Sequence, residues 1–294
     1  MLGGSGFLGA PLVHRLVAAG IRTTCLVHRT PIGIPGIREL RGSLDRFPWR
    51  SLEQEAPDVV FHLARIPGRG GLRGALTRVR NRLANTRMAL GLGAWAKPPL
   101  VVFVGGTLAY GTHGESLVTE QTRLNPISFS RDYHRAEQPW LRAQRFSDVP
   151  VIIVRPAWVL GPGAWFERFY RRFIRAERAI PLYGAGENWM SIVHVDDCAG
   201  LLAHVAHHAA PMSAVNVFTH APLRQVELAE RLADVTGLKI RRISLAAVEQ
   251  QLGRAVREAF TFSARIGTVH QALHARYRAE HPDLDADLRA LLTD

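Results

Sequence analysis

Short apolar segments alternate with helical segments along the first 156 residues of the chain. The strand-like segments are Thr23–Val27, Ile37–Leu40, Pro57–Ala64, Leu100–Val104 and Val149–Pro156. Helical apolar spacing occurs in Pro11–Ala19, Asn81–Trp95 and Asp132–Arg145. This alternation is typical of a parallel, doubly wound sheet, and nearly continuous apolar strands fit a sheet covered on both faces. The sequence therefore predicts an α/β fold.

A second, smaller lobe is expected after Pro156, where the pattern becomes irregular and rich in Gly, Pro and aromatic residues. Ser191–Val195 and Ala214–Phe218 are predicted strands, and Asp197–His208 is a predicted helix. We therefore expect a first domain at 1–160, to which 190–218 returns, and a smaller C-terminal lobe at 161–294.

Glycines recur at Gly3, Gly6 and Gly9, directly before the first predicted helix. The free N–H groups and the dipole at a helix N-terminus favour an anionic group such as a pyrophosphate. Three glycines alone are weak evidence, but this loop opens an alternating α/β chain, where such folds bind dinucleotides.

Only Met1 and Leu2 precede Gly3, whereas a strand of ~5 to 6 residues is expected there. That strand is central in the usual strand order, and its loss leaves neighbouring strand edges unpaired. We expect the first strand to be truncated, or the start to be assigned too late. A chain extended to an upstream in-frame start should then be more soluble and bind coenzyme better, and equal behaviour of both forms would contradict this expectation.

Several motifs along the chain resemble those of the extended short-chain dehydrogenase/reductases, the NAD-dependent epimerase/dehydratase family. They are Gly3–Gly9, Asp58–Ala64, Asn81 with Asn85-Thr86, Ala109-Tyr110-Gly111, Val154-Arg155-Pro156 with Gly161-Pro162-Gly163, and Val193–Asp197. The resemblance implies a Rossmann-type domain that binds NAD(P). It also implies an epimerase, dehydratase or reductase acting on a sugar-nucleotide-like or other small hydroxy or keto substrate.

The same resemblance implies a set of coenzyme-binding residues. They are Gly3, Gly6, Phe7, Leu8, Gly9, His28, Arg29, Ser43, Leu44, Leu63, Ala64, Arg65, Asn81 and Pro156. In this family the residue at the end of the second strand contacts the ribose of the coenzyme. An acid at this position selects NAD, and a basic residue accommodates the phosphate of NADP. Arg29 stands there without an acid, so NADP is favoured over NAD. Ser43 replaces the adenine-contacting Asp of the family.

The catalytic residues of the family are a Tyr, a Lys four positions later and a Ser or Thr. Thr107 is the local hydroxyl residue. One alignment register matches Tyr133 to the Tyr of the family and Glu137 to its Lys. A second register places Phe129 on the Tyr and Tyr133 on the Lys. In the first register a carboxylate next to the phenol would favour its protonated form, whereas lysine favours the phenolate. Arg131 or Arg135 are candidate sources of a compensating positive charge.

Only two of the 37 basic residues, Lys97 and Lys239, are lysines, and neither lies near the catalytic position in the sequence. Two functions therefore stay open: an atypical enzyme that uses Tyr133 and Thr107, and a catalytically degenerate protein that binds NAD(P) or supports an assembly. A net charge of +12 could indicate nucleic acid. The basic stretches lack interleaved aromatic residues and nucleic-acid motifs, so none is expected as a partner.

The basic segment 165–178 has an apolar face and an arginine face, which fits a core helix, a pocket wall or a membrane-surface helix. Asp196 and Asp197 are expected to cap a helix, and no metal site is expected. Cys25 and Cys198 are predicted buried thiols. No apolar run reaches membrane-spanning length and no signal core is visible, so a cytoplasmic location is expected. A homodimer and peripheral membrane contact stay open.

Overall fold

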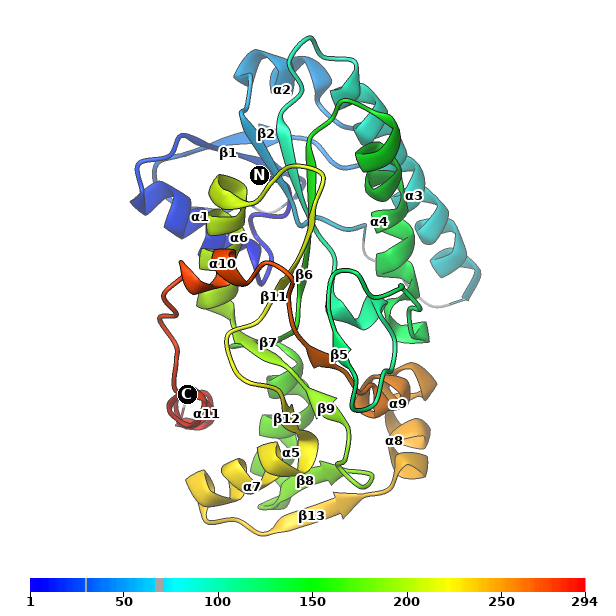
Figure 1. The fold of residues 1–294 in the computed structure, drawn as a ribbon, viewed down its shortest axis with the longest axis vertical. Helices are drawn as coiled ribbons and strands as arrows, with labels where there is room; N and C mark the ends of the chain where they lie inside the picture. Colours follow the sequence, from blue (N-terminus) through cyan, green and yellow to red (C-terminus); the bar gives the residue numbers. More distant parts are fainter. Residues whose placement is uncertain (30, 67–70, 294) are drawn as a thin grey trace. The chain divides into compact units, whose positions relative to one another are not determined.

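The computed structural model describes residues 1–29, 31–66 and 71–293, which form two compact units (Figure 1). Unit 1 comprises Met1–Gly105, Asp132–Arg155 and Ala199–Val215. Unit 2 comprises Gly106–Arg131, Pro156–Cys198 and Asn216–Asp294. The chain thus enters unit 2 before the expected boundary at residue 160, and a shorter segment than 190–218 returns to unit 1.

Unit 1 is built around the parallel strands that the alternating pattern predicts. These strands are β1 (Thr23–Val27), β2 (Ile37–Arg41), β3 (Val59–His62), β4 (Leu100–Val104), β6 (Val151–Pro156) and β11 (Ala214–Val217). β1 pairs with β2, and β3, β4, β6 and β11 lie side by side in that order. β3 with β4, and β4 with β6, are parallel. The Rossmann-type sheet is therefore confirmed.

Leu2 lies between β1 and β3 and forms isolated bridges with Leu26 and His62. The Leu2 N–H donates to the Phe61 carbonyl and the Leu26 N–H to the Met1 carbonyl, both at 2.9 Å. Two residues thus occupy the central place in which the sequence predicts a longer strand. A hollow of about 320 Å³ lies against them, lined also by Thr23, Thr24, Leu52 and Val60.

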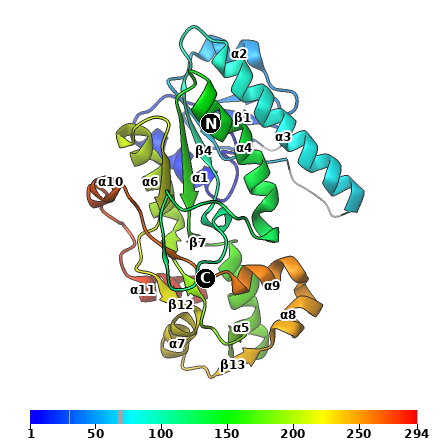
Figure 2. The ribbon, with the colours of Figure 1, turned by 45° about the vertical axis from the view of Figure 1, so that its right-hand side comes forward.

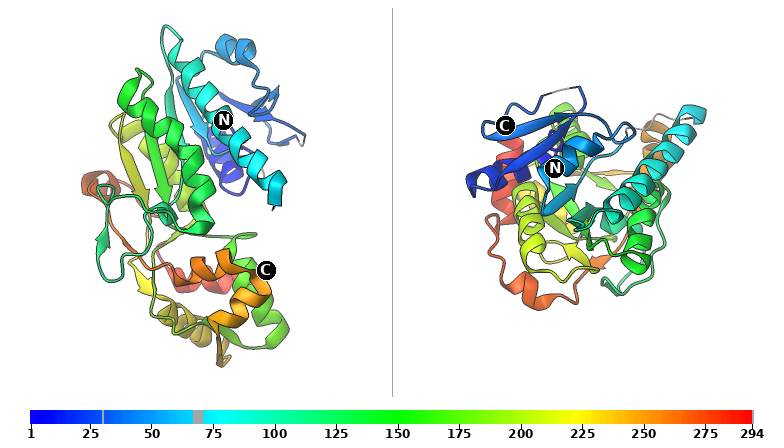
Figure 3. Two further views of the ribbon diagram at one scale, coloured as in Figure 1. Left: turned by 90° about the vertical axis from the view of Figure 1, so that its right-hand side faces the viewer. Right: turned by 90° about the horizontal axis from the view of Figure 1, so that it is seen from above.

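Helices cover both faces of this sheet, with α1 and α6 on one face and α3 and α4 on the other (Figures 1 and 3). The helices are α1 (Gly9–Ala18), α2 (Trp49–Glu55), α3 (Gly71–Gly93), α4 (Arg131–Phe146) and α6 (Val195–His208). α3 begins well before the predicted start at Asn81. Trp140 of α4, Leu92 of α3 and Ile153 of β6 are buried in one core, which explains why the strands are apolar throughout.

Unit 2 contains short paired strands. β7 (Trp158–Leu160) pairs with β10 (Ile192–His194), β8 (Ile180–Tyr183) with β13 (Ile240–Ile243), β9 (Trp189–Met190) with β12 (Leu223–Arg224), and β5 (Leu117–Val118) with β14 (Arg265–Ile266). Its helices, several of which Figure 2 shows, are α5 (Arg172–Glu177), α7 (Gln225–Thr236), α8 (Leu245–Leu252), α9 (Arg254–Thr261), α10 (Gln271–Ala275) and α11 (Leu284–Thr293). Short helices η1 (Thr107–Ala109) and η2 (Ser128–Ser130) precede them.

The basic segment 165–178 forms a π-helical stretch, η3 (Glu167–Arg171), followed by α5. Its Phe166, Tyr170 and Ile174 are buried in the core of unit 2. The core-helix interpretation is therefore confirmed, and the apolar face needed by a membrane-surface helix is already covered. Among the described residues, no helix combines the length and the apolar character needed to cross a bilayer.

Candidate coenzyme and catalytic sites

The glycine loop is held by close backbone contacts at the N-terminus of α1. A Cβ on Gly9 would lie 1.9 Å from the Gly3 carbonyl oxygen, and one on Gly3, whose φ is +88°, would lie 2.9 Å from the Ala64 nitrogen. A Cβ on exposed Gly6 would meet only the Gly3 oxygen, at 3.2 Å. α1 has no side-chain cap and no acid in its first turn. This cradle of backbone N–H groups fits a pyrophosphate.

His28 and Arg29 directly follow β1 and are both exposed. Within the described ranges, Arg29 forms no ion pair. An exposed guanidinium at this position suits a 2′-phosphate, to which it can donate two parallel hydrogen bonds.

The segment after β2 contains the acid Asp45, two residues after Ser43. The Ser43 hydroxyl donates to Asp45 Oδ1 at 2.8 Å, and Arg80 forms an ion pair with the same carboxylate. The Ser43 hydrogen bond, followed by that from Arg80, lowers the pKa of Asp45 to about 2. Leu44 is buried in the core. The Ser43 hydroxyl is therefore already hydrogen-bonded to Asp45, two residues further along the chain.

The segment after β3 is held in place by Asn81 of α3. Asn81 Oδ1 accepts from the Ile66 N–H at 3.1 Å, and its Nδ2 donates to the Ile66 carbonyl at 3.2 Å. This clamp fixes the end of the stretch formed by Leu63, Ala64 and Arg65. Both hydrogen-bonding groups of the Asn81 amide thus serve the loop, so its contribution to a coenzyme site is to position that loop.

Tyr133, in the first turn of α4, carries a guanidinium over its ring. The Arg65 guanidinium carbon lies 3.5 Å from the ring centroid, within cation–π distance. Tyr133 is 37% exposed. Arg135, one of the two arginines considered from the sequence, is instead paired with Asp132 at 3.2 Å. The sequence gives no sign of the Arg65 contact because the two residues lie on separate elements.

Glu137, one turn further along α4, points into the core. Its Oε1 accepts from Arg155 Nη2 at 2.5 Å and from Nε at 3.1 Å, and both side chains are at least 97% buried. Burial alone would raise the pKa of Glu137, but His134 and Arg155 together hold that pKa below its ordinary value. Arg155 pairs with Glu137 inside the core, so the charge of this carboxylate is balanced there; its effect on the Tyr133 phenol stays a prediction.

Thr107 and Phe129 both belong to unit 2. Thr107 is buried, and its hydroxyl donates to the Pro156 carbonyl at 3.2 Å. Its oxygen can still accept a hydrogen bond, so Thr107 fits a role as an acceptor better than as a donor. Phe129 lies in η2, is 36% exposed and has no group that transfers protons.

Comparisons with known proteins relate most of the chain to one family. The family model for the NAD dependent epimerase/dehydratase family matches residues 1–217. A curated relative, the chloroplastic SDR39U1 homolog of Arabidopsis thaliana, described as an epimerase family protein, is 24% identical over 245 residues. The match covers 79% of this chain and 69% of the relative.

Solved structures share the fold at low sequence identity. Human epimerase family protein SDR39U1 (isoform 2) with NADPH superposes with a TM-score of 0.77 at 20% identity, covering 100% of this chain and 98% of that one. UDP-N-acetylglucosamine 4-epimerase of Methanobrevibacter ruminantium M1, in complex with UDP-N-acetylmuramic acid, has a TM-score of 0.77 at 15% identity, covering 99% and 96%. With the family model matching most of its length, the chain belongs to the NAD-dependent epimerase/dehydratase family.

Proposed function

We propose that unit 1 binds NADP, in preference to NAD, and that the protein is an epimerase, dehydratase or reductase acting on a sugar-nucleotide-like or similar small substrate. The observation that carries this proposal is the glycine cradle at α1 together with the exposed Arg29 beyond β1. The NADPH in the human relative and the sugar nucleotide in the archaeal epimerase support it.

In this proposal the coenzyme supplies the hydride acceptor or donor. The backbone of Gly3–Gly9 binds the pyrophosphate, and Arg29 binds the ribose phosphate. The proposed binding residues are completed by Phe7, Leu8, His28, Ser43, Leu44, Leu63, Ala64, Arg65 and Pro156, and Asn81 positions the loop. The substrate lobe that we propose is the C-terminal part of the chain, from 161 onward, which lies in unit 2 except for Ala199–Val215.

Tyr133 is the proposed proton-transfer residue, and Thr107 the residue that hydrogen-bonds the substrate oxygen. Arg65 is the cation next to the Tyr133 ring, in place of the lysine that the family holds four residues after its tyrosine. An arginine supplies positive charge but does not release its proton. Any proton passing through Tyr133 must therefore move on through water or substrate.

The alternative is a protein that binds coenzyme without turnover. The buried Glu137–Arg155 pair favours it, because the lysine position now belongs to the core. Loss of a tuned general acid–base typically costs ~10² to 10⁴ in rate. Binding and catalysis are therefore separable questions for this chain.

Titration of NADPH and NADH, followed by their fluorescence, tests the binding proposal. We expect NADPH to bind more tightly than NADH. Gly6→Ala should bind NADPH more weakly, because its new Cβ projects into the cradle proposed for the pyrophosphate. That Cβ meets nothing on the protein closer than 3.2 Å, so the fold should be unaffected. A native-like circular dichroism spectrum of that variant excludes misfolding. Absence of binding by the unmodified chain would contradict the proposed function.

Turnover of UDP- and dTDP-sugars by the NADP-bound protein separates the two functions. We expect Tyr133→Phe to lower kcat by ~10² to 10⁴ while the Kd for NADPH changes little. Coenzyme binding with no turnover of any sugar nucleotide would favour the alternative. Equal rates of wild type and Tyr133→Phe would remove Tyr133 from the mechanism.

A second copy of the chain is the partner that we propose for unit 1. Leu76, Val79, Leu83 and Leu90 form an exposed apolar face of α3, and Phe146 of α4 is 82% exposed beside a hollow of about 410 Å³. Sedimentation velocity should show a dimer that Leu83→Glu dissociates. Binding to anionic vesicles in the same buffer would instead support peripheral membrane contact.

A further inference from the structure

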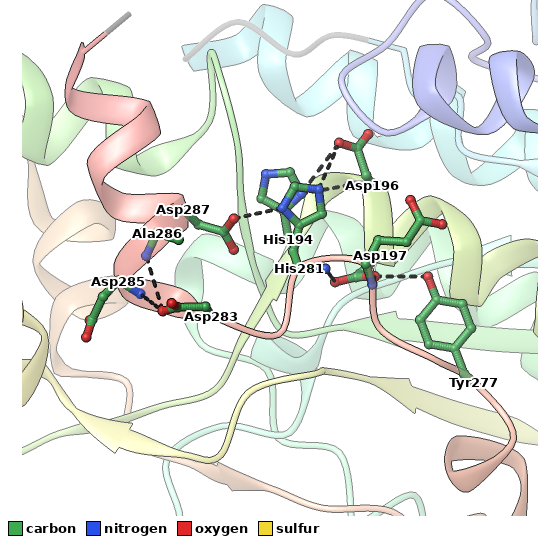
Figure 4. Close-up of polar contacts among 10 residues, drawn as sticks. His194, Asp196, Asp197, Tyr277, His281, Asp283, Asp285, Ala286 and Asp287 are labelled. Carbon is green, nitrogen blue, oxygen red and sulfur yellow. Dashed lines mark hydrogen bonds and ion pairs between the residues drawn. The ribbon is translucent and has the colours of Figure 1, made fainter.

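Three side chains with metal-ligating atoms meet at the start of α6 in unit 2 (Figure 4). Asp196 Oδ2 lies 3.6 Å from His194 Nδ1 and 3.6 Å from His281 Nε2. The three ligand atoms all lie within 4.8 Å of one another. Two imidazole nitrogens and one carboxylate oxygen form the donor set of many three-ligand zinc sites.

A fourth residue fixes the orientation of His281. Its Nδ1 lies 2.7 Å from Asp287 Oδ1, so the Nδ1–H donates to the carboxylate and the Nε2 lone pair is directed toward Asp196. Asp287 is 7% exposed, and among the described residues its Oδ2 has no hydrogen-bond partner. A buried carboxylate behind a histidine is the usual outer partner of a metal-binding imidazole.

Asp197 holds the backbone of the same segment. Its carboxylate accepts from the Tyr277 hydroxyl at 3.0 Å, from the Glu280 N–H at 2.7 Å and from the His281 N–H at 3.1 Å. Asp197 is fully buried. Its acceptor capacity thus serves the 277–281 segment, which corrects the expectation that it caps the helix, and His281 is held against the first turn of α6.

We propose that His194, Asp196 and His281 bind a divalent transition-metal ion, with Zn²⁺ as the best fit and solvent as a further ligand. Tetrahedral coordination at ~2.1 Å places neighbouring ligands ~3.4 Å apart, close to the 3.6 Å separations of the two His–Asp pairs, while the two histidine nitrogens lie within 4.8 Å of each other. The two rings are stacked, with centroids 3.5 Å apart and planes at 22°. His194 Nδ1 also accepts from the Asp196 N–H at 3.3 Å. The in-plane lone pairs of both rings must converge on an ion, so metal binding opens this stack and replaces that hydrogen bond.

The bound ion joins the segment after α10 to the start of α6, independently of coenzyme and substrate. Asp196 and Asp197 alone lack ligand spacing, so their sequence pattern predicts no metal here. The third ligand, His281, comes from a distant part of the chain and is placed only by the fold.

Zn²⁺ titration of the chelator-treated full chain against a chromophoric competitor tests the site. We expect one tight equivalent, which His194→Gln and His281→Gln lose, and a 10- to 100-fold weaker site in Asp287→Asn. A matched control is His204→Gln/His208→Gln, because these rings lie 4.4 Å apart on α6 and can bind zinc adventitiously. The control should keep the tight equivalent.

Co²⁺ provides a second readout that does not depend on affinity alone. Visible d–d bands of tetrahedral intensity should appear in wild type and in the control, and disappear in His281→Gln at unchanged far-ultraviolet circular dichroism. Tight binding that survives both single substitutions, or that is lost in the control, would overturn the proposal. So would the absence of any tight equivalent in wild type.

Discussion

Two arginines contact side chains one turn apart on α4, in opposite surroundings. Arg155 reaches Glu137 inside the core, where both side chains are at least 97% buried. Arg65 lies over the ring of Tyr133, which is 37% exposed. Along the same face of α4, one turn apart, one arginine contact is thus buried in the core and the other lies at a partly exposed ring.

The two contacts bear on the position of the family lysine. In the first register Glu137 occupies that position, and its charge is neutralised within the core by Arg155. Positive charge reaches Tyr133 from the segment after β3 instead. The same residue type, abundant throughout this chain, neutralises a buried acid at one site and lies over a partly exposed ring at the other.

The largest effect is expected from Arg155→Met, which leaves the Glu137 carboxylate buried beside His134 but without the guanidinium. Breaking a buried pair costs ~3 to 5 kcal/mol of unfolding free energy. Urea unfolding at neutral pH measures this loss. The difference from wild type should shrink in acid, because a protonated Glu137 costs less to bury.

The double variant Glu137→Leu/Arg155→Met is the control for that experiment. Replacing both charges by apolar side chains is often neutral, so much of the lost stability should return. A cost below ~1 kcal/mol for Arg155→Met would show that this pair resembles an exposed one.

An intermediate effect is expected from Arg65→Met. Cation–π contacts contribute ~0.5 to 2 kcal/mol, so loss of ring positioning should lower kcat by about 2- to 30-fold. Arg65→Lys should restore part of that loss, since it keeps the charge. If the Kd for NADPH rises while kcat is constant, Arg65 contacts the coenzyme and does not position Tyr133.

The smallest effect is expected at the exposed Arg80–Asp45 pair. Because the folded pKa of Asp45, about 2, lies below its ordinary 3.8, the stability from this group is present above pH ~4. It is lost as the pH falls through about 2. Arg80→Gln should raise the Asp45 pKa and cost at most ~1 kcal/mol. Carboxyl NMR titration measures the rise in the Asp45 pKa. Ser43→Ala should raise this pKa more than Arg80→Gln does, because the Ser43 hydrogen bond is the larger cause of its lowering.

The local patterns in the sequence predicted much of unit 1. Strands at Thr23–Val27 and Leu100–Val104 have the predicted bounds, and α4 differs from its predicted range by one residue at each end. Helical and strand periodicities arise within a few neighbouring residues, so a single sequence records them. Unit 2 was predicted less well, because its strands have two to four residues and pair across long separations.

The sequence by itself determined the alternating α/β fold and the glycine loop, because both depend on residue type and local spacing. Only the tertiary structure decided which arginine meets Tyr133, which one neutralises Glu137, and that His281 joins His194 and Asp196. These contacts link segments that are far apart along the chain. Packing of helices against the sheet in unit 1, and of the segment after α10 in unit 2, brings them together, and no local pattern encodes such distances.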